Sequence, residues 1–269
     1  MGAAHARLRA GTAWFGSRVS LRGPAETPNA QGTNAPPAPS YHPSQRRPHD
    51  AASLILVSHE DSGPRVLMGR RNMAMRFLPG IYVFPGGRVE RTDSGIELAH
   101  GLPAHVQQKL TNGAPRLSLQ RAQALAAAAI RETAEETGLF LGVRGEWKRR
   151  RIPPSWSAFA GESVVPDLSG LALIARAVTP TGLPRRYDTR FFAADAASVA
   201  ARGELPAGPD AELDDLRWLT REETDELDLL PITRVILEEL FRRIEAGISR
   251  DLPVPFFRFR AGRMRRDEI

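Results

Sequence analysis

The sequence contains no cysteine, and lysine occurs only at Lys109 and Lys148. The absence of cysteine excludes disulfides, thiolate metal sites and a cysteine nucleophile, but it does not indicate a compartment. The chain also lacks any apolar run close to the roughly 20 residues of a membrane-spanning helix. We therefore expect a soluble protein that makes no membrane contact.

The net charge of +6 is carried almost entirely by arginine. A basic chain attracts polyanions, including phosphorylated small molecules. No stretch interleaves aromatic and basic residues as a base-stacking surface would, so we do not expect nucleic-acid binding. With 269 residues and 42% hydrophobic residues, the chain is long enough to bury a substantial core.

Composition divides the chain into three parts. Residues 1–50 are rich in Ala, Pro, Gly, Ser and Asn with few bulky apolar side chains. Such a segment buries too little surface to offset its ordering entropy, and we predict a disordered tail. Its early arginines give it the composition of a transit peptide, although a GC-rich gene produces the same pattern. We expect one folded domain over residues 51–250 and a basic C-terminal extension over 251–269.

Hydrophobic patterning within residues 51–250 predicts strands interspersed with a few helices. A β-branched run over 52–58 and its partner over 65–70 favour a hairpin with a turn at 61–64. A long helix is expected from an N-cap at Ser118 to Thr137, where Gly138 ends it. We predict further strands over 82–84, 171–178, 190–193 and 216–219, a short helix after Thr220 and an amphipathic helix from Pro231. This order indicates an α+β domain with a mixed sheet.

Three carboxylates share one face of the predicted long helix. Glu132, Glu135 and Glu136 stand at i, i+3 and i+4, positions that lie within a few ångströms of one another. Their mutual repulsion is unfavourable unless a hard divalent cation such as Mg²⁺ or Mn²⁺, which prefers oxygen ligands, lies among them. Taken alone, the cluster is also compatible with a solvated acidic helix face. Arg131 precedes it and can hold one carboxylate by a bidentate pair.

A second segment, Phe84-Pro85-Gly86-Gly87-Arg88-Val89-Glu90, combines a strand end with a glycine loop. Together with Arg131–Leu139 it resembles the Nudix box, G-x5-E-x7-R-E-U-x-E-E-x-G-U, in which U is apolar. Thr133 stands at a usually aliphatic position, and Asp93 replaces the first Glu. An insertion of about 30 residues, approximately 94–123, splits the box and contains a short helix near 104–110. Because an insertion at a loop–helix junction costs little, we expect the two halves to meet.

The resemblance implies a Nudix α/β/α sandwich with a helical insertion in the box, and metal-dependent hydrolysis of a nucleoside diphosphate linked to another group. It makes Glu132, Glu135 and Glu136 ligands of Mg²⁺ or Mn²⁺, with the carbonyl of Gly87 as a further ligand. Arg131 is expected to orient a carboxylate. Family members often take the general base from outside the box, and Glu212 is a candidate, although it is also readable as an exposed loop acid.

The substrate is expected to be coenzyme A or acyl-coenzyme A. The run from Arg76 to Gly87 is similar to the latter part of the signature of coenzyme A-cleaving Nudix enzymes, and the split box with Thr179-Pro180 and Arg185–Phe192 is similar to the branch of the animal peroxisomal coenzyme A diphosphatases. The ending Asp267-Glu268-Ile269 is not a peroxisomal signal, so we expect a cytoplasmic protein similar to the bacterial relatives of this branch. Substrate contacts are expected at Gly86 and Gly87 and from Arg70, Arg71 and Arg76, with Arg185, Arg186 and Arg190 as alternatives, because guanidinium groups suit phosphates.

Two alternatives remain open at this stage. The first is another diphosphate substrate, such as ADP-ribose, NADH or a nucleotide sugar. The second is a non-catalytic nucleotide-sensing Nudix module. The presence of Asp93 in place of Glu favours this alternative, and the three retained glutamates argue against it. The sequence does not decide between a monomer and a homodimer.

Overall fold

Alternating side chains on one long strand establish two hydrophobic layers. In the computed structural model, strand β1 (His49–Glu60) directs Leu54 and Leu56 into one buried cluster and Ile55 and Val57 into the other. This alternation is the period-two pattern of a strand that is covered on both faces. The structure describes residues 47–75, 77–181, 183, 185–205, 207–208, 211–247, 252–260 and 263–269. The predicted tail therefore lies almost entirely outside the described residues.

The central sheet is mixed, as expected. Its strand order is β11-β2-β1-β9-β8-β12-β13, with β3 paired to β2 and β4 paired to β1. The β1–β9 and β8–β12 pairs are parallel, and the other pairs are antiparallel. Besides β1, the strands are β2 (Gly63–Arg71), β3 (Tyr82–Val83), β4 (Gly86–Arg88), β8 (Ala172–Val178), β9 (Tyr187–Asp195), β11 (Leu213–Leu219), β12 (Pro255–Arg260) and β13 (Arg263–Glu268).

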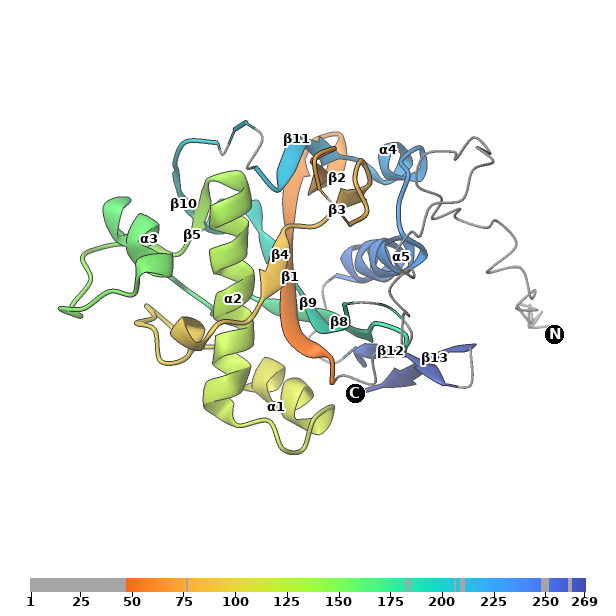
Figure 1. Ribbon diagram of the computed structural model, residues 1–269, viewed down its shortest axis with the longest axis horizontal. Coiled ribbons are helices and arrows are strands. Elements are labelled where there is room, and N and C mark those ends of the chain that lie inside the picture. The colour runs from red at the N-terminus through yellow and green to blue at the C-terminus, as the bar shows by residue number, and fades with distance from the viewer. Residues whose placement is uncertain are drawn as a thin grey trace, which may run out of the picture. The chain divides into compact units, whose positions relative to one another are not determined.

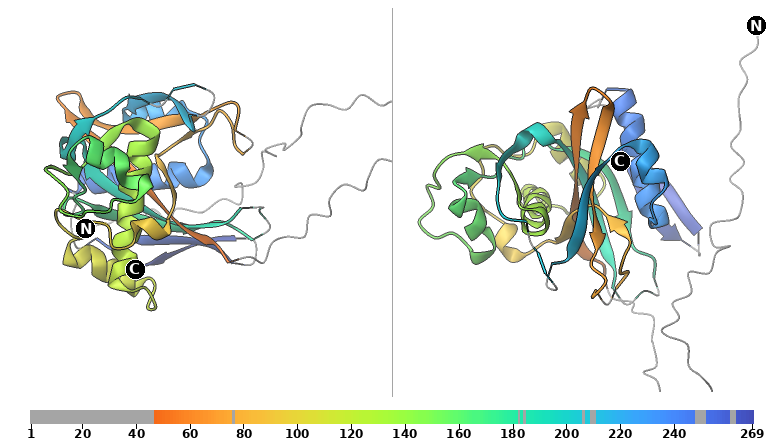
Figure 2. Two further views of the ribbon diagram at one scale, coloured as in Figure 1. Left: turned by 60° about the vertical axis from the view of Figure 1, so that its left-hand side comes forward. Right: turned by 90° about the horizontal axis from the view of Figure 1, so that it is seen from above.

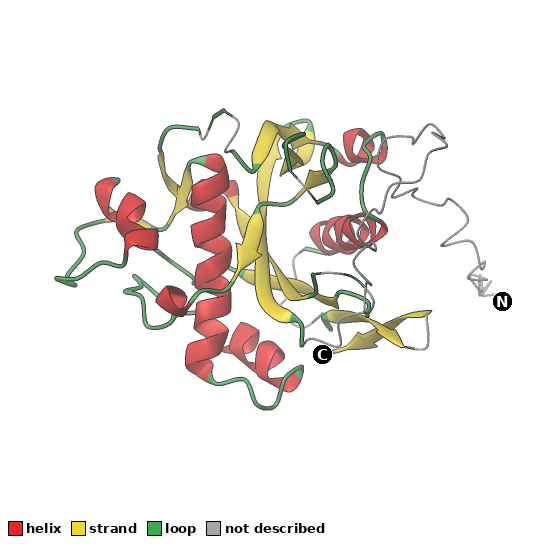
Figure 3. Cartoon of the chain, viewed as in Figure 1, coloured by secondary structure: helices red, strands yellow, loops and turns green. Residues whose placement is uncertain are grey.

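Helices cover both faces of this sheet (Figure 1). The helix α2 (Leu119–Thr137) packs on one face with α1 (Ala104–Asn112) beside it, and α5 (Pro231–Glu245) with the short α4 (Arg221–Asp225) covers the other. The view from above shows the sheet between α2 and α5 (Figure 2), and the separation of helical and strand layers is clear in Figure 3. The fold is therefore the α+β, helix–sheet–helix arrangement that the sequence predicts.

Helix α2 begins and ends where the sequence predicts. Ser118 is its N-cap and accepts a hydrogen bond from the backbone N–H of Arg121 at 3.2 Å. Gly138 ends it with a φ of 68°, a left-handed conformation that glycine adopts without a Cβ penalty. The buried alanines Ala122 and Ala126–Ala129 belong to the hydrophobic cluster between α2 and the sheet, and such small side chains allow the helix to lie close to β1.

Besides the C-terminal strands β12 and β13, the sequence patterns did not predict several short segments that lie beside α2. They are β5 (Leu139–Leu141), which pairs with β10 (Val199–Arg202), and β6 (Val143–Arg144), which pairs with β7 (Val164–Val165), together with α3 (Ser157–Gly161). Strands of two to four residues have too few positions to display a periodicity. Within the described residues, no helix combines the length and apolar character needed to cross a membrane.

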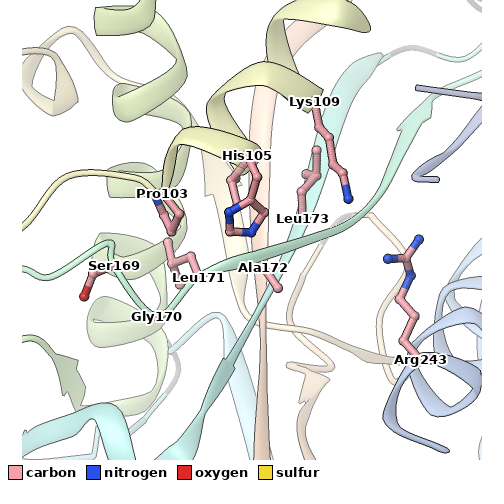
Figure 4. Close-up of a pocket in the computed structure, with 10 residues that line it drawn as sticks. Pro103, His105, Lys109, Ser169, Gly170, Leu171, Ala172, Leu173 and Arg243 are labelled. Atoms are coloured by element: carbon pink, nitrogen blue, oxygen red, sulfur yellow. The ribbon is translucent and has the colours of Figure 1, made fainter. Parts of the chain in front are cut away.

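The C-terminal residues 255–268 add two strands to the sheet and contact the insertion. Just before these strands, the carbonyl of Leu252 accepts a hydrogen bond from Lys109 of α1 at 2.9 Å. The carbonyl of Pro253 accepts one from Arg243 of α5. Around these side chains and the start of β8 lies a cavity of about 230 Å³ (Figure 4). Because Lys109 and Arg243 both bind backbone carbonyls of the 252–253 segment, they tie this segment to α1 and α5.

Candidate active site

Strand β4 brings the glycine pair of the first half-box against α2. The three residues of β4 pair with β1, where Gly86, Gly87 and Arg88 lie opposite Ser53, Ala52 and Ala51. The segment that the sequence predicted to be a glycine loop is therefore a short strand. Gly86 has a φ of 153°, and a Cβ there would lie 2.5 Å from the carbonyl oxygen of Ala52. Only glycine permits this approach. The pairing of β4 with β1 directs the backbone N–H of Gly86 toward α2.

Both glycines contact carboxylates of α2. The N–H of Gly86 donates to Oε2 of Glu136 at 2.9 Å. At Gly87, a Cβ would lie 2.4 Å from the Glu132 carboxylate, so that carboxylate occupies the space that any other residue's side chain would fill. The structure therefore brings Gly86, Gly87, Glu132 and Glu136 together at one site between β4 and α2.

Arg131 joins the two halves of the split box. Its Nε donates to Oδ1 of Asp93 at 2.8 Å and its Nη2 to Oδ2 at 3.1 Å, and both side chains are almost completely buried. Asp93 also accepts the backbone N–H of Glu90 at 2.7 Å. The insertion lies between these residues in sequence and leaves them in contact, as expected. Asp93 thus holds Arg131 although it is shorter by one methylene than the usual Glu.

The remaining Nη1 of Arg131 lies between two carboxylates of the cluster. It is 3.0 Å from Oε1 of Glu132 and 2.8 Å from Oε2 of Glu135. Arg131 therefore orients carboxylates, which is the role that the resemblance implied. The other departure from the box, Thr133, is fully buried and donates its hydroxyl to the carbonyl of Ala129 at 2.8 Å, so its polar group is satisfied within the helix.

Burial and mutual repulsion raise the pKa of all three glutamates. For Glu132 burial is the largest cause, partly opposed by Arg131, and its pKa rises to about 7. Burial is also the main reason why the pKa of Glu136 lies well above its ordinary value, and the charges of Glu132 and Glu212 add to it. The pKa of Glu135 is raised mainly by burial as well. The site therefore carries more negative charge than its own cations compensate.

This donor set fits a hard divalent cation. Carboxylate and carbonyl oxygens are the ligands that Mg²⁺ and Mn²⁺ prefer, and the uncompensated charge would be neutralised by such an ion. In the part of the chain that the structure describes, no three acidic or histidine side chains already converge as a ready-made cage. The reason is that Glu132 and Glu135 turn to Arg131 while Glu136 turns to Gly86, so metal binding requires side-chain rotation.

The raised pKa of Glu132 predicts a stability that depends on pH and metal. Between pH 4.5 and about 7 the folded state keeps a proton that the unfolded state has released, so the free energy of unfolding falls as pH rises through this window. At about 1.4 kcal/mol per pKa unit, Glu132 accounts for a loss of about 3 kcal/mol. We expect chemical denaturation of metal-free protein at pH 5 and pH 8 to show this loss, and Glu132→Gln to remove much of it.

Mg²⁺ or Mn²⁺ should stabilise the protein more at pH 8 than at pH 5, because protons compete with the metal for the same carboxylates. Equal stabilisation at both pH values, or a Glu132→Gln variant with the wild-type pH dependence, would contradict the assignment.

The arginines predicted to contact substrate are distributed over different places. On β2, Leu67 faces the cluster under α2, whereas Val66 and Met68 face the cluster under α5. By this alternation Arg70 points to the α5 face, where its Nε pairs with Asp214 at 2.7 Å. Strand geometry therefore directs Arg70 away from the α2 face, where the carboxylates lie. Arg71, one residue on, shares the α2 face.

The other arginine candidates also differ in position. Arg190 is buried and paired with Asp50 at 2.9 Å, beside Arg121 near the start of α2, so it is removed from the carboxylates. Arg186 donates to the carbonyl of Thr179 at 3.3 Å in the β8–β9 turn, which lies away from the C-terminal half of α2 in both views (Figures 1 and 2). Arg185 is exposed in the same turn. Arg76 lies outside the described residues.

Glu212 immediately precedes β11, and its backbone carbonyl accepts the N–H of Asn72 at 3.0 Å. Its charge acts on both Glu132 and Glu136. The exposed acid that the sequence suggested as a base candidate thus lies in the electrostatic range of the cluster.

Comparison with known proteins gives similarities to Nudix hydrolases. No family model matches the chain. A Nudix hydrolase from Alicyclobacillus acidocaldarius aligns at 27% identity and a TM-score of 0.56, covering 78% of this chain and 98% of that structure. A Caenorhabditis elegans protein provisionally named nudix hydrolase 7 is 26% identical over 154 residues, 53% of this chain and 42% of that protein. The chain thus spans less than half the length of this curated relative.

A more remote structure, the NUDIX domain of Shewanella oneidensis NrtR with ADP ribose, aligns at 12% identity and a TM-score of 0.42, which is too distant to inform function. The nearer similarities are both to Nudix hydrolases. They specify neither its metal nor its substrate.

Proposed function

We propose that this chain, which has the Nudix fold and is similar to a Nudix hydrolase over 78% of its length, hydrolyses the diphosphate of coenzyme A or acyl-coenzyme A with the help of a divalent cation. The observation that carries the hydrolytic part is the convergence of Glu132 and Glu136 on Gly86 and Gly87. The coenzyme A assignment rests on the sequence similarity around Arg76–Gly87 and on the split box.

Each residue of the site has a separate role in this proposal. Glu132, Glu135 and Glu136, with the carbonyl of Gly87, would hold Mg²⁺ or Mn²⁺. When bound, the ion supplies neutralisation of charge on the diphosphate and lowers the pKa of a coordinated water. Arg131 keeps Glu132 and Glu135 on one side of the site through the hydrogen bonds of its Nη1.

Glu212 is our candidate for the general base. It is exposed, so water reaches it, and its charge acts on both Glu132 and Glu136, which agrees with a position near the cluster. A base in this position would accept a proton from the attacking water as the water oxygen bonds to phosphorus, while the P–O bond to the bridging oxygen breaks and the other phosphate leaves. Gly86 and Gly87 leave the approach to the cluster free of side chains on the β4 side, where the substrate diphosphate would lie.

A substrate panel tests the proposal. Purified protein with Mg²⁺ or Mn²⁺ is assayed against coenzyme A, acetyl-coenzyme A, ADP-ribose, NADH and a dinucleoside polyphosphate, and products are identified by chromatography. We expect a kcat/KM for one of the two coenzyme A species at least about tenfold above the others, a difference of about 1.4 kcal/mol. Good turnover of ADP-ribose with no turnover of either coenzyme A species would overturn the substrate assignment but leave the reaction class intact.

A further inference from the structure

Arg71 occupies the end of β2 on the same face as the carboxylate cluster. The alternation that puts Leu67 under α2 puts Gly69 and Arg71 there as well. The position of Gly69 confirms the face, because a Cβ there would contact Leu213 and Leu216, and Leu216 packs against the α2 cluster. The side chain of Arg71 is half-buried, so it lies at the edge of the site and is reachable from solvent.

The backbone on both sides holds Arg71 in place. Its N–H donates to the carbonyl of Ile81 at 2.9 Å, and its carbonyl accepts from Gly80 at 2.8 Å. Across the sheet it lies opposite Leu213 of β11, directly after Glu212. Arg71 and Glu212 therefore lie close together at the ends of two paired strands. The backbone hydrogen bond from Asn72 to Glu212 holds these two strand ends next to each other.

The guanidinium of Arg71 is only partly used within the protein. Its Nε donates to the carbonyl of Phe77 at 3.1 Å, a neutral acceptor that fixes the side chain without neutralising it. Among the described residues we find no hydrogen bond from its two Nη groups, so this edge of the guanidinium is available to bind two oxygens of a phosphate. The charge of Arg71 also acts on the Glu136 carboxylate, which agrees with a position beside the cluster.

We propose that Arg71 binds a non-bridging oxygen pair of the substrate diphosphate, on the phosphate that the Glu132–Glu136 cluster does not hold. Arg70, its neighbour with the same side chain, cannot reach this position, because it points to the opposite face and is paired with Asp214. The inference rests on the proposed function for the identity of the substrate. It specifies which arginine of the Arg70-Arg71 pair recognises the diphosphate, a choice that the sequence leaves open.

The test compares Arg71→Ala, Arg71→Lys and the matched control Arg70→Ala. Charge-assisted hydrogen bonds of this kind predict that Arg71→Ala weakens binding by about 10- to 100-fold. We expect this loss mainly in KM, with Arg71→Lys intermediate because it keeps the charge without the fork, and with added guanidinium ion restoring part of the activity of Arg71→Ala. Arg70→Ala should lower thermal stability through the lost Asp214 pair and change KM by less than about twofold.

Binding of ADP to metal-free protein, measured by calorimetry, separates this inference from the proposed function. If wild type hydrolyses no member of the panel but binds ADP, and Arg71→Ala loses that binding while Arg70→Ala keeps it, then the proposed function fails and the inference stands. If Arg71→Ala and Arg70→Ala have the same KM and the same ADP affinity as wild type, the inference is wrong. Loss of activity in Arg71→Ala without rescue by guanidinium or by Lys, and with a lowered melting temperature, would also overturn it in favour of a loop-supporting role.

Discussion

Replacing Glu136 by Gln should abolish hydrolysis while leaving the protein folded. Glu136 is 7% exposed and accepts the Gly86 N–H at 2.9 Å, and the amide oxygen of Gln can keep this hydrogen bond. The substitution removes the negative charge that metal binding needs. Since metal-ion catalysis contributes several kcal/mol and each 1.36 kcal/mol is tenfold in rate, we expect kcat to fall on the order of a thousandfold.

The same substitution should not destabilise the metal-free protein. Because burial raises the pKa of Glu136, the ionised carboxylate is costly in the folded state above that pKa, and the neutral amide avoids this cost. Denaturation at pH 8 should therefore show Glu136→Gln to be at least as stable as wild type. Glu238→Gln, on the exposed face of α5, is the matched control and should change neither quantity. Retention of most metal-dependent turnover in Glu136→Gln would show that the cluster is not the reaction centre.

Removal of Asp93 should have the largest effect on stability. Asp93 and Arg131 are 1% and 2% exposed, and the carboxylate accepts two hydrogen bonds from the guanidinium. Asp93→Ala leaves the buried guanidinium with one partner fewer, a loss that costs about 3–5 kcal/mol for a buried pair. Urea denaturation should show this drop, and activity should fall with it because Arg131 no longer has a fixed position from which to orient Glu132 and Glu135.

An exposed ion pair of the same kind provides the control. Arg221 and Glu245 are 2.7 Å apart, with side chains 50% and 66% exposed. Glu245→Ala should cost less than about 1 kcal/mol, because solvent screens such pairs. If Asp93→Ala is no more destabilising than Glu245→Ala, Asp93 does not hold the split box together, and the insertion must be accommodated by other contacts.

The carboxylate helix was predictable because its signals are local. A serine cap, a glycine stop and three glutamates at i, i+3 and i+4 specify one helix with one acidic face, and these features depend only on neighbouring residues. The buried strands 52–58 and 65–70 were predictable for the same reason. The short strands β5 to β7 were not predictable in this way. They form because they pair with segments distant in sequence, as β5 does with β10, and the local sequence carries no sign of that pairing.

The substrate-facing arginines show the same limit. Arg70 and Arg71 are equivalent as sequence, and only the side-chain alternation of a paired strand assigns one to each face of the sheet. Glu212 has no sequence signal beyond its charge, and the β2–β11 pairing brings it near the cluster.

The box from Arg131 to Leu139 and the glycines before it were therefore sufficient to predict, from sequence alone, the chemistry that we propose, because residue type and helical spacing limit what the carboxylates can bind. Whether the two halves of the box meet was decided by tertiary structure. The insertion folds as α1 against the cluster under α2, and this packing leaves Asp93 in contact with Arg131 although 38 positions separate them. The physical reason is that a buried ion pair depends on the three-dimensional positions of its two groups, which sequence separation does not specify.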